Sequence, residues 1–234
     1  MKDRLHLLLA SSLAVFVVGI AIAMAMYPGG TWNDPMHQGH DFLQNFFCDL
    51  THDVALNGGG NRWGSRIATV AMVALVPGMV AFWLLTARLL PRGFGQTMVR
   101  VSGIFSAVGV AVVAVLPSNH LGPLHGFAVI MGTVPGLFAS LTATAGLLRA
   151  GHKAAAALGG LTLLTSAIDA ALYVQHISAH ANSTHPLLAP VQKVAAGFLV
   201  AWMASVALAA SKPKKATATK LPPPSPAEED PSAV

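Results

Sequence analysis

The sequence has little charge for its length. Only 10% of its 234 residues are charged, against about 25% in an average soluble domain, while 54% are hydrophobic. A globule of this size cannot bury so much apolar surface, which excludes a soluble Rossmann-type domain, a disulfide-stapled secreted domain and a disordered chain. A lipid bilayer must cover the surface instead, so the sequence is that of an integral membrane protein.

Cysteine is almost absent. The single residue, Cys48, excludes an internal disulfide and a thiolate metal cluster, and we expect it to pack as a small apolar residue. The net charge of +5 would suggest a nucleic-acid partner in a soluble protein. Here the cations lie between apolar runs, so they indicate membrane topology and no nucleic-acid binding.

Long apolar runs are abundant. Six are long enough to cross a hydrocarbon core of roughly 30 Å, and they lie near 5–27, 67–87, 101–117, 123–148, 154–180 and 187–210. We predict an all-α fold: a six-helix transmembrane bundle over 1–210, followed by a disordered cytoplasmic tail over 211–234. A signal peptide is the alternative for the first run, but its apolar stretch is longer than usual for one.

The basic residues predict the orientation. Eleven of them flank the spans on one side, whereas only Arg62 and Arg66 lie on the other. By the positive-inside rule both termini are cytoplasmic, in a multi-pass protein of the cytoplasmic (inner) membrane surrounded by its lipids. We expect Arg62 and Arg66 to pair with acids of the outer loop, with binding of an anionic lipid or substrate headgroup as the alternative.

The outer loop between the first two spans, residues 28–64, carries turn and helix signals that a plain linker lacks. Turn-forming residues open it, and glycines close it at 58–60. Between them Phe42, Phe46, Leu50 and Val54 repeat at helical spacing. We therefore predict a short amphipathic helix over 41–54 that roofs the outer mouth of the bundle. We call the whole loop, residues 28–64, the cap loop.

Histidines are distributed unevenly. Of ten, only His6 and His152 fall on the cytoplasmic side, and the other eight are His37, His40, His52, His120, His125, His176, His180 and His185. Histidines near an interface are often ordinary surface residues, so the distribution matters more than any one of them.

The fifth span carries a polar stripe. Asp169, Tyr173, His176 and His180 lie within roughly 60° of one another on a helix. Because unpartnered polar groups are costly in hydrocarbon, we expect the stripe to face the bundle interior. Lys193 of the sixth span lies at a similar depth, and we predict that it pairs with Asp169.

The spacing also predicts a metal site. Two histidines at i and i+4, His176 and His180, can both reach one ion, and a third ligand is available from His120, His125 or His52. Three histidines with an open fourth position form a catalytic zinc geometry, with Asp49 or Asp53 as general base or supporting carboxylate. The alternative is a pair of interfacial histidines at a helix end.

Two resemblances bear on these patterns. The motifs Y-P-G-G-T-W at 27–32, N-F-F-C-D-L at 45–50 and L-P-S-N-H-L-G-P-L-H at 116–125, on six short spans, resemble an uncharacterised family of bacterial six-span membrane proteins related to the DRAM type. That likeness implies the fold and the topology, since the family has no settled activity.

Residues 48–52 and the H-x-x-x-H at 176–180 resemble the zinc site of the CREST hydrolases, the alkaline ceramidase type. Cys48 stands where that family has serine, and six spans stand in place of seven. This likeness implies a zinc-dependent hydrolase.

Three functions remain open on the sequence alone. The first is a metal-dependent hydrolase, with zinc as cofactor, that acts on a lipid amide or ester entering from the membrane. The second is a redox or sensor protein that binds haem b or a metal through histidines of different helices. The third is a proton-coupled transporter that uses Asp169.

Overall fold

The computed structural model describes residues 4–116, 118–178 and 185–211, with side chains described except at 118–123 and 176–178. Within these residues the fold is all-helical, without strands, and six helices are long and apolar enough to span a membrane. They are α1 (Leu5–Met26), α2 (Arg62–Leu89), α3 (Phe94–Val115), α4 (Ser118–Arg149), α5 (Lys153–Ser178) and α6 (Leu188–Ser211). The predicted six-helix bundle is confirmed, and the tail from 212 lies outside the described residues.

Three helices begin well before their apolar runs. α2 starts at Arg62 instead of residue 67, α3 at Phe94 instead of residue 101, and α4 at Ser118 instead of residue 123. Intrahelical hydrogen bonding continues beyond the hydrocarbon, where long basic side chains reach the polar interface. Hydropathy therefore locates the spans but underestimates the helices.

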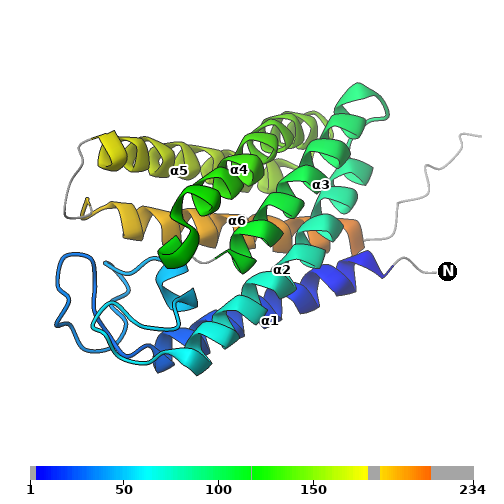
Figure 1. The fold of residues 1–234 in the computed structure, drawn as a ribbon. Coiled ribbons are helices and arrows are strands. Elements are labelled where there is room, and N and C mark those ends of the chain that lie inside the picture. The colour runs from blue at the N-terminus through cyan, green and yellow to red at the C-terminus, as the bar shows by residue number, and fades with distance from the viewer. Residues whose placement is uncertain (1–3, 117, 179–184, 212–234) are drawn as a thin grey trace, which may run out of the picture.

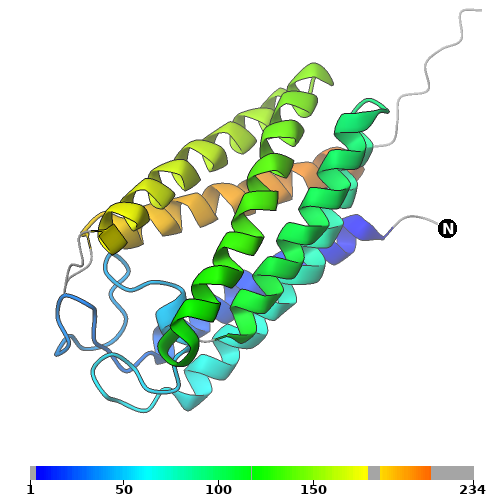
Figure 2. The same cartoon turned by 45° about the horizontal axis from the view of Figure 1, so that its top comes forward.

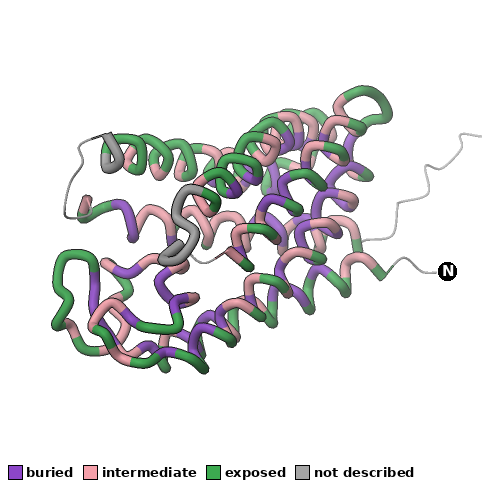
Figure 3. The backbone as a smooth tube through the Cα atoms, viewed as in Figure 1, coloured by how far each residue is buried: buried purple, intermediate pink, exposed green. Residues whose placement is uncertain are grey.

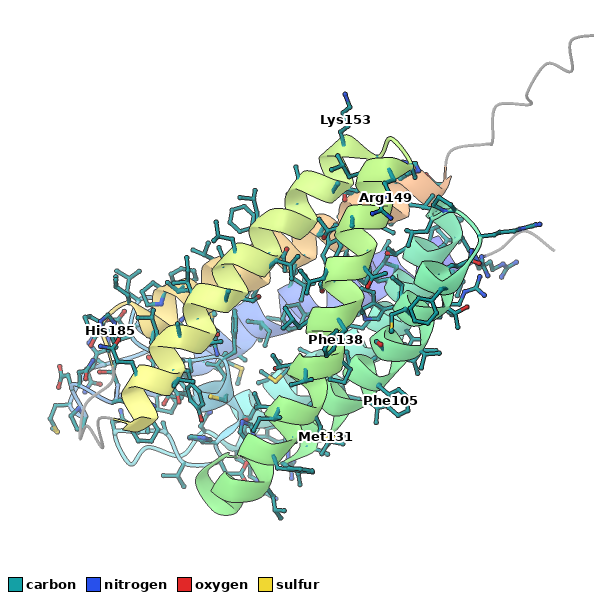
Figure 4. The ribbon with its side chains drawn as sticks, turned by 90° about the horizontal axis from the view of Figure 1, so that it is seen from above. Phe105, Met131, Phe138, Arg149, Lys153 and His185 are labelled. Carbon is teal, nitrogen blue, oxygen red and sulfur yellow. The ribbon has the colours of Figure 1, made fainter. Side chains whose placement is uncertain are left out.

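The helices run antiparallel in sequence order, so α1 begins and α6 ends at one end of the bundle (Figure 1). The cap loop occupies the other end. Arg149 and Lys153 lie at the first end, while His185 lies at the cap end (Figure 4). α4 and α5 diverge from their short connection towards the cap end, which the rotated view also shows (Figure 2).

The core is centred on an aromatic group from α2 and α6. The ring of Phe82 lies 4.6 Å from that of Trp83 and 5.0 Å from that of Trp202, centroid to centroid. Buried residues line the inside of the bundle and exposed residues its outside (Figure 3). Phe105 and Phe138 point outward and are more than half exposed. Such an apolar exterior is what a bilayer covers.

Small residues set the distance between α3 and α4. A Cβ built on Gly109 would collide with the backbone of Gly132 on the facing helix. Where only glycine fits, the two backbones are in direct contact, which is how membrane helices maximise packing without a hydrophobic driving force.

The predicted helix over 41–54 is wrong. The cap loop, bounded in the structure by α1 and α2 at 27–61, contains only the 3-10 helix η1 (Cys48–Thr51). Oδ1 of Asp41 accepts hydrogen bonds from the backbone N–H groups of Leu43 and Gln44, at 2.7 and 3.2 Å. Oδ1 of Asn45 accepts from the N–H of Asp41 at 2.9 Å. These short polar side chains satisfy the backbone locally and so replace the helix.

We expect Gly109→Ala to lower the free energy of unfolding by about 1–3 kcal/mol, because the facing backbone cannot yield to the added methyl group. Gly160→Ala on α5 is the matched control, since a Cβ at that position would meet nothing within 4 Å. Denaturation in mixed micelles would measure both. Equal stability of the two variants would contradict the close contact of α3 and α4.

Candidate functional site

Asp49, one of the two predicted catalytic carboxylates, lies at the centre of the cap loop and is 1% exposed. Its Oδ2 accepts from the N–H of Phe46 at 2.7 Å and from Nδ2 of Asn45 at 3.3 Å. Its Oδ1 accepts from the indole N–H of Trp32 at 3.2 Å. Burial raises the pKa of Asp49, while these donors and His52 oppose the rise. Because both oxygens are engaged, the geometry favours a structural role.

Lys193 fastens the cap loop to α6. Its side chain is 6% exposed, and its ammonium donates to the carbonyl oxygen of Asn45. The ammonium lies 5.2 Å from the ring centre of Phe42 and 5.6 Å from that of Phe47. The neighbouring Gln192 accepts a hydrogen bond from the N–H of Phe47 at 3.1 Å. We call Gln192 and Lys193 the α6 latch.

The predicted ion pair between Asp169 and Lys193 is wrong. The acidic groups whose charge acts on Lys193 are Asp49 and Asp41 of the cap loop, and within the described residues no opposite charge acts on Asp169. The pair was predicted because the two residues lie at similar depths on their helices. Depth alone does not show that the cap loop folds inward and supplies the hydrogen-bond acceptor of Lys193.

His40 lies within the cap loop, where its ring meets that of Tyr27 edge to face at 6.0 Å. Burial and the nearby charge of Lys193 lower the pKa of His40 to about 4, and His37 acts in the same direction while Asp41 opposes it. The ring is therefore neutral at pH 7. An unfolded histidine titrates near pH 6.5, so His40 stabilises the closed cap above that pH and this contribution is lost as the pH falls towards 4.

Tyr27 follows the last residue of α1 and lies beside His40. Its hydroxyl oxygen accepts a hydrogen bond from the N–H of Leu56 at 3.1 Å. Burial raises the pKa of Tyr27 to about 12, so the phenol stays neutral. Tyr27 packs with Leu50 and Ala55 in a small apolar core that joins the cap loop to α1 and α2.

The other two loop candidates differ in exposure. His52 is 3% exposed, and its backbone carbonyl oxygen accepts from Nδ2 of Asn61 at 3.0 Å. Asp53 is exposed, and its Oδ1 accepts from Oγ of Ser65 at 2.6 Å. His52 thus belongs to the interior of the cap loop, and Asp53 to its surface at the start of α2.

The polar stripe of α5 faces inward only at the end far from the cap. Thr162 is buried, Asp169 is half-buried, and Tyr173 is 49% exposed. The expectation that the whole stripe faces the interior is therefore wrong. The reason is the divergence of α4 and α5, which leaves Tyr173 at the surface.

The predicted metal ligands are only partly described. The side chains of His120 and His176 lie outside the described residues, as does all of His180. His125 is described, and its Nδ1 lies 2.6 Å from the carbonyl oxygen of Leu116. Among the described residues there is no group of three or more histidines, cysteines or acids placed to hold a metal ion.

Several residues that organise the cap loop were not predicted from the sequence. A tryptophan in an outer loop is typical of the membrane interface, yet the indole N–H of Trp32 donates to Oδ1 of Asp49. Gln192 had no assigned role, and it accepts from a residue 145 positions away. The i, i+4 spacing of Asn45 and Asp49 is a signal that local reasoning could have used, whereas the contacts with α6 required the tertiary fold.

Comparison of the chain with protein-family models, with curated proteins and with solved structures found no match. Both family resemblances therefore stay predictions, and function has to be inferred from the geometry.

We expect Lys193→Met to loosen the cap loop. The substitution removes a charged hydrogen bond worth about 1.5–3 kcal/mol, so local opening should increase about tenfold or more. Cys48 lies in the cap loop and is the only cysteine, so its rate of maleimide labelling in micelles reports the opening. The control is Val194→Met, at a neighbouring half-exposed position. Equal labelling rates in the two variants would show that the α6 latch does not hold the cap.

Proposed function

We propose that this protein binds an amphipathic, lipid-like molecule, which enters from the membrane between the cap-side halves of α4 and α5. The observation that supports this most strongly is Asp169. It is the only acidic residue in the six spans, and among the described residues nothing forms a hydrogen bond or ion pair with its carboxyl group. Ionisable residues inside membrane helices that lack a structural partner mark functional sites.

The surroundings of Asp169 define the chemistry of the ligand. Tyr173 follows one turn later on the same face and is half exposed. A carboxyl group accepts hydrogen bonds, and a phenol both donates and accepts. Leu164 and Ile168, close by on α5, are exposed apolar residues. A long apolar chain that ends in a hydroxyl, amide or amine group fits both the polar and the apolar parts.

The position of Asp169 and Tyr173 along α5 indicates the leaflet from which the ligand would enter. Asp169 and Tyr173 lie on the part of α5 that runs towards the cap end, away from Arg149 and Lys153. The positive-inside rule supports a cytoplasmic location for the basic end. The ligand would then come from the extracytoplasmic leaflet.

We expect Asp169→Asn with Tyr173→Phe to reduce photolabelling by a diazirine-bearing long-chain amino alcohol at least fivefold, because two polar contacts worth about 1 kcal/mol or more are changed. Labelled peptides should map to α4 and α5. Val174→Ala, at an exposed position on another face of α5, is the matched control. A diazirine-bearing alkane should label all variants equally. Undiminished labelling of the double variant by the amino alcohol would refute the proposal.

A metal-dependent hydrolase of a lipid amide or ester is the second candidate, and His125 favours it. A carbonyl oxygen only accepts hydrogen bonds, so Nδ1 of His125 carries the proton that it donates to Leu116. The lone pair of a neutral ring is then on Nε2, which is the arrangement of a metal-ligating histidine. His176, His180 and His120 would complete the ligand set. Bound zinc would supply an acidified water, and Asp53 is the accessible carboxylate. Haem b would use the same histidines.

We expect the purified protein, without a histidine tag, to contain about one zinc ion per chain if this candidate holds. The His176→Ala, His180→Ala double variant should lose it while keeping its thermal unfolding midpoint, and His6→Ala is the control. Elemental analysis measures the metal, and visible absorption detects haem. A metal-free wild type, or full metal content in the double variant, would exclude the hydrolase without affecting the ligand site at Asp169.

A further inference from the structure

A shallow groove of about 250 Å³ runs along the outside of the bundle between α1 and α2. Its lining residues are Val15 and Gly19 of α1 with Trp63, Arg66, Ile67, Val70 and Ala71 of α2. The helices are in close contact at its floor, since a Cβ built on Gly19 would lie 2.7 Å from the Cβ of Ala71. The groove is therefore a permanent feature of a tight helix pair, remote from α4 and α5.

One cation, Arg66, lines the cap end of the groove, and a second, Arg62, lies next to it outside the lining. The guanidinium of Arg66 lies 5.2 Å from the ring centre of Trp63, and Arg62 precedes it by one helical turn. Neither arginine forms an ion pair within the described part of the chain, which corrects the expectation that they pair with loop acids. Asp49 accepts from Trp32 and Asn45, and Asp53 from Ser65, so these carboxylates serve the cap loop instead.

The polar residues of the groove lie at its cap end, and the apolar residues lie deeper in the membrane. Arg62 and Trp63 form the first turn of α2, and Arg66 begins the second. From Trp63 to Ala71 the groove follows the helix for about 12 Å at a rise of 1.5 Å per residue. Trp63 is 66% exposed, as an aromatic residue at the interface between headgroups and chains often is. Beyond Arg66 the described lining is apolar.

We propose that this groove binds one anionic phospholipid of the cap-side leaflet, with its phosphate at Arg62 and Arg66 and one acyl chain against Val15, Ile67 and Val70. Two cations without acidic partners among the described residues favour an anion, and the apolar groove that continues from Arg66 fits a chain attached to it. The first turn of α2 has no acidic residue of its own, and the one cap-loop acid next to it, Asp53, accepts from Ser65. Trp63 would cover the glycerol region.

Native mass spectrometry of the full chain in detergent, titrated with phosphatidylglycerol or phosphatidylcholine, tests the assignment. We expect tighter binding of one phosphatidylglycerol than of phosphatidylcholine. Arg62→Gln with Arg66→Gln should weaken phosphatidylglycerol binding about tenfold or more and leave phosphatidylcholine unchanged. Arg92→Gln, an exposed arginine between α2 and α3 at the opposite end, is the matched control.

A second variant tests the groove separately from the charge. Val70→Trp keeps both arginines and fills the groove at a position that is 63% exposed, so folding should be unaffected while the acyl chain is displaced. Its affinity for phosphatidylglycerol should fall several-fold, and soluble glycerophosphate should not compete. Equal binding of the two lipids, undiminished binding in the double arginine variant, unchanged binding in Val70→Trp, or full competition by glycerophosphate would each overturn the proposal. None of these outcomes bears on Asp169.

Discussion

The whole structure depends on the absence of water from the hydrocarbon core. Every backbone N–H and C=O in the spans must find its partner within the same helix, which leaves the six helices no other conformation. Apolar side chains gain nothing by leaving lipid for a protein interior, so the helices associate through close packing. Gly109 against Gly132 and Gly19 against Ala71 are two places where this packing brings helices into close contact.

The cap loop obeys the opposite constraint. It lies outside the spans and has no long helix, so its backbone groups are satisfied by short polar side chains such as Asp41, Asn45 and Asp49. The same loop makes the burial of Lys193 possible. Removing an ammonium from water is costly, and the carbonyl oxygen of Asn45 and two aromatic faces replace part of its hydration. The loop and the charge therefore stabilise each other.

The sequence was sufficient for the spans, because their signal is simply length and apolarity, and both are local. It was misleading at 41–54, where apolar residues repeat with helical spacing but Asp and Asn side chains capture the backbone first. It also matched Asp169 to Lys193 by depth alone. Which partner Lys193 takes depends on how a loop some 150 residues earlier folds onto α6, and periodicity carries no information about that contact. The uneven distribution of the histidines can be read from the sequence. Whether their side chains come together depends on how far α4 and α5 diverge, which residue spacing does not reveal.

Two charged residues of the spans, Asp169 and Lys193, make the strongest case about function. Lys193 is buried, and its hydrogen bond and aromatic contacts explain structurally why a charged residue is present there. Asp169 has no such explanation, since no donor or cation in the described part of the protein compensates the cost of placing a carboxyl group in hydrocarbon. An apolar residue at position 169 would serve the fold better. Within the described residues no donor reaches Asp169, and under the proposed function a membrane-borne molecule supplies it from the side where α5 diverges from α4.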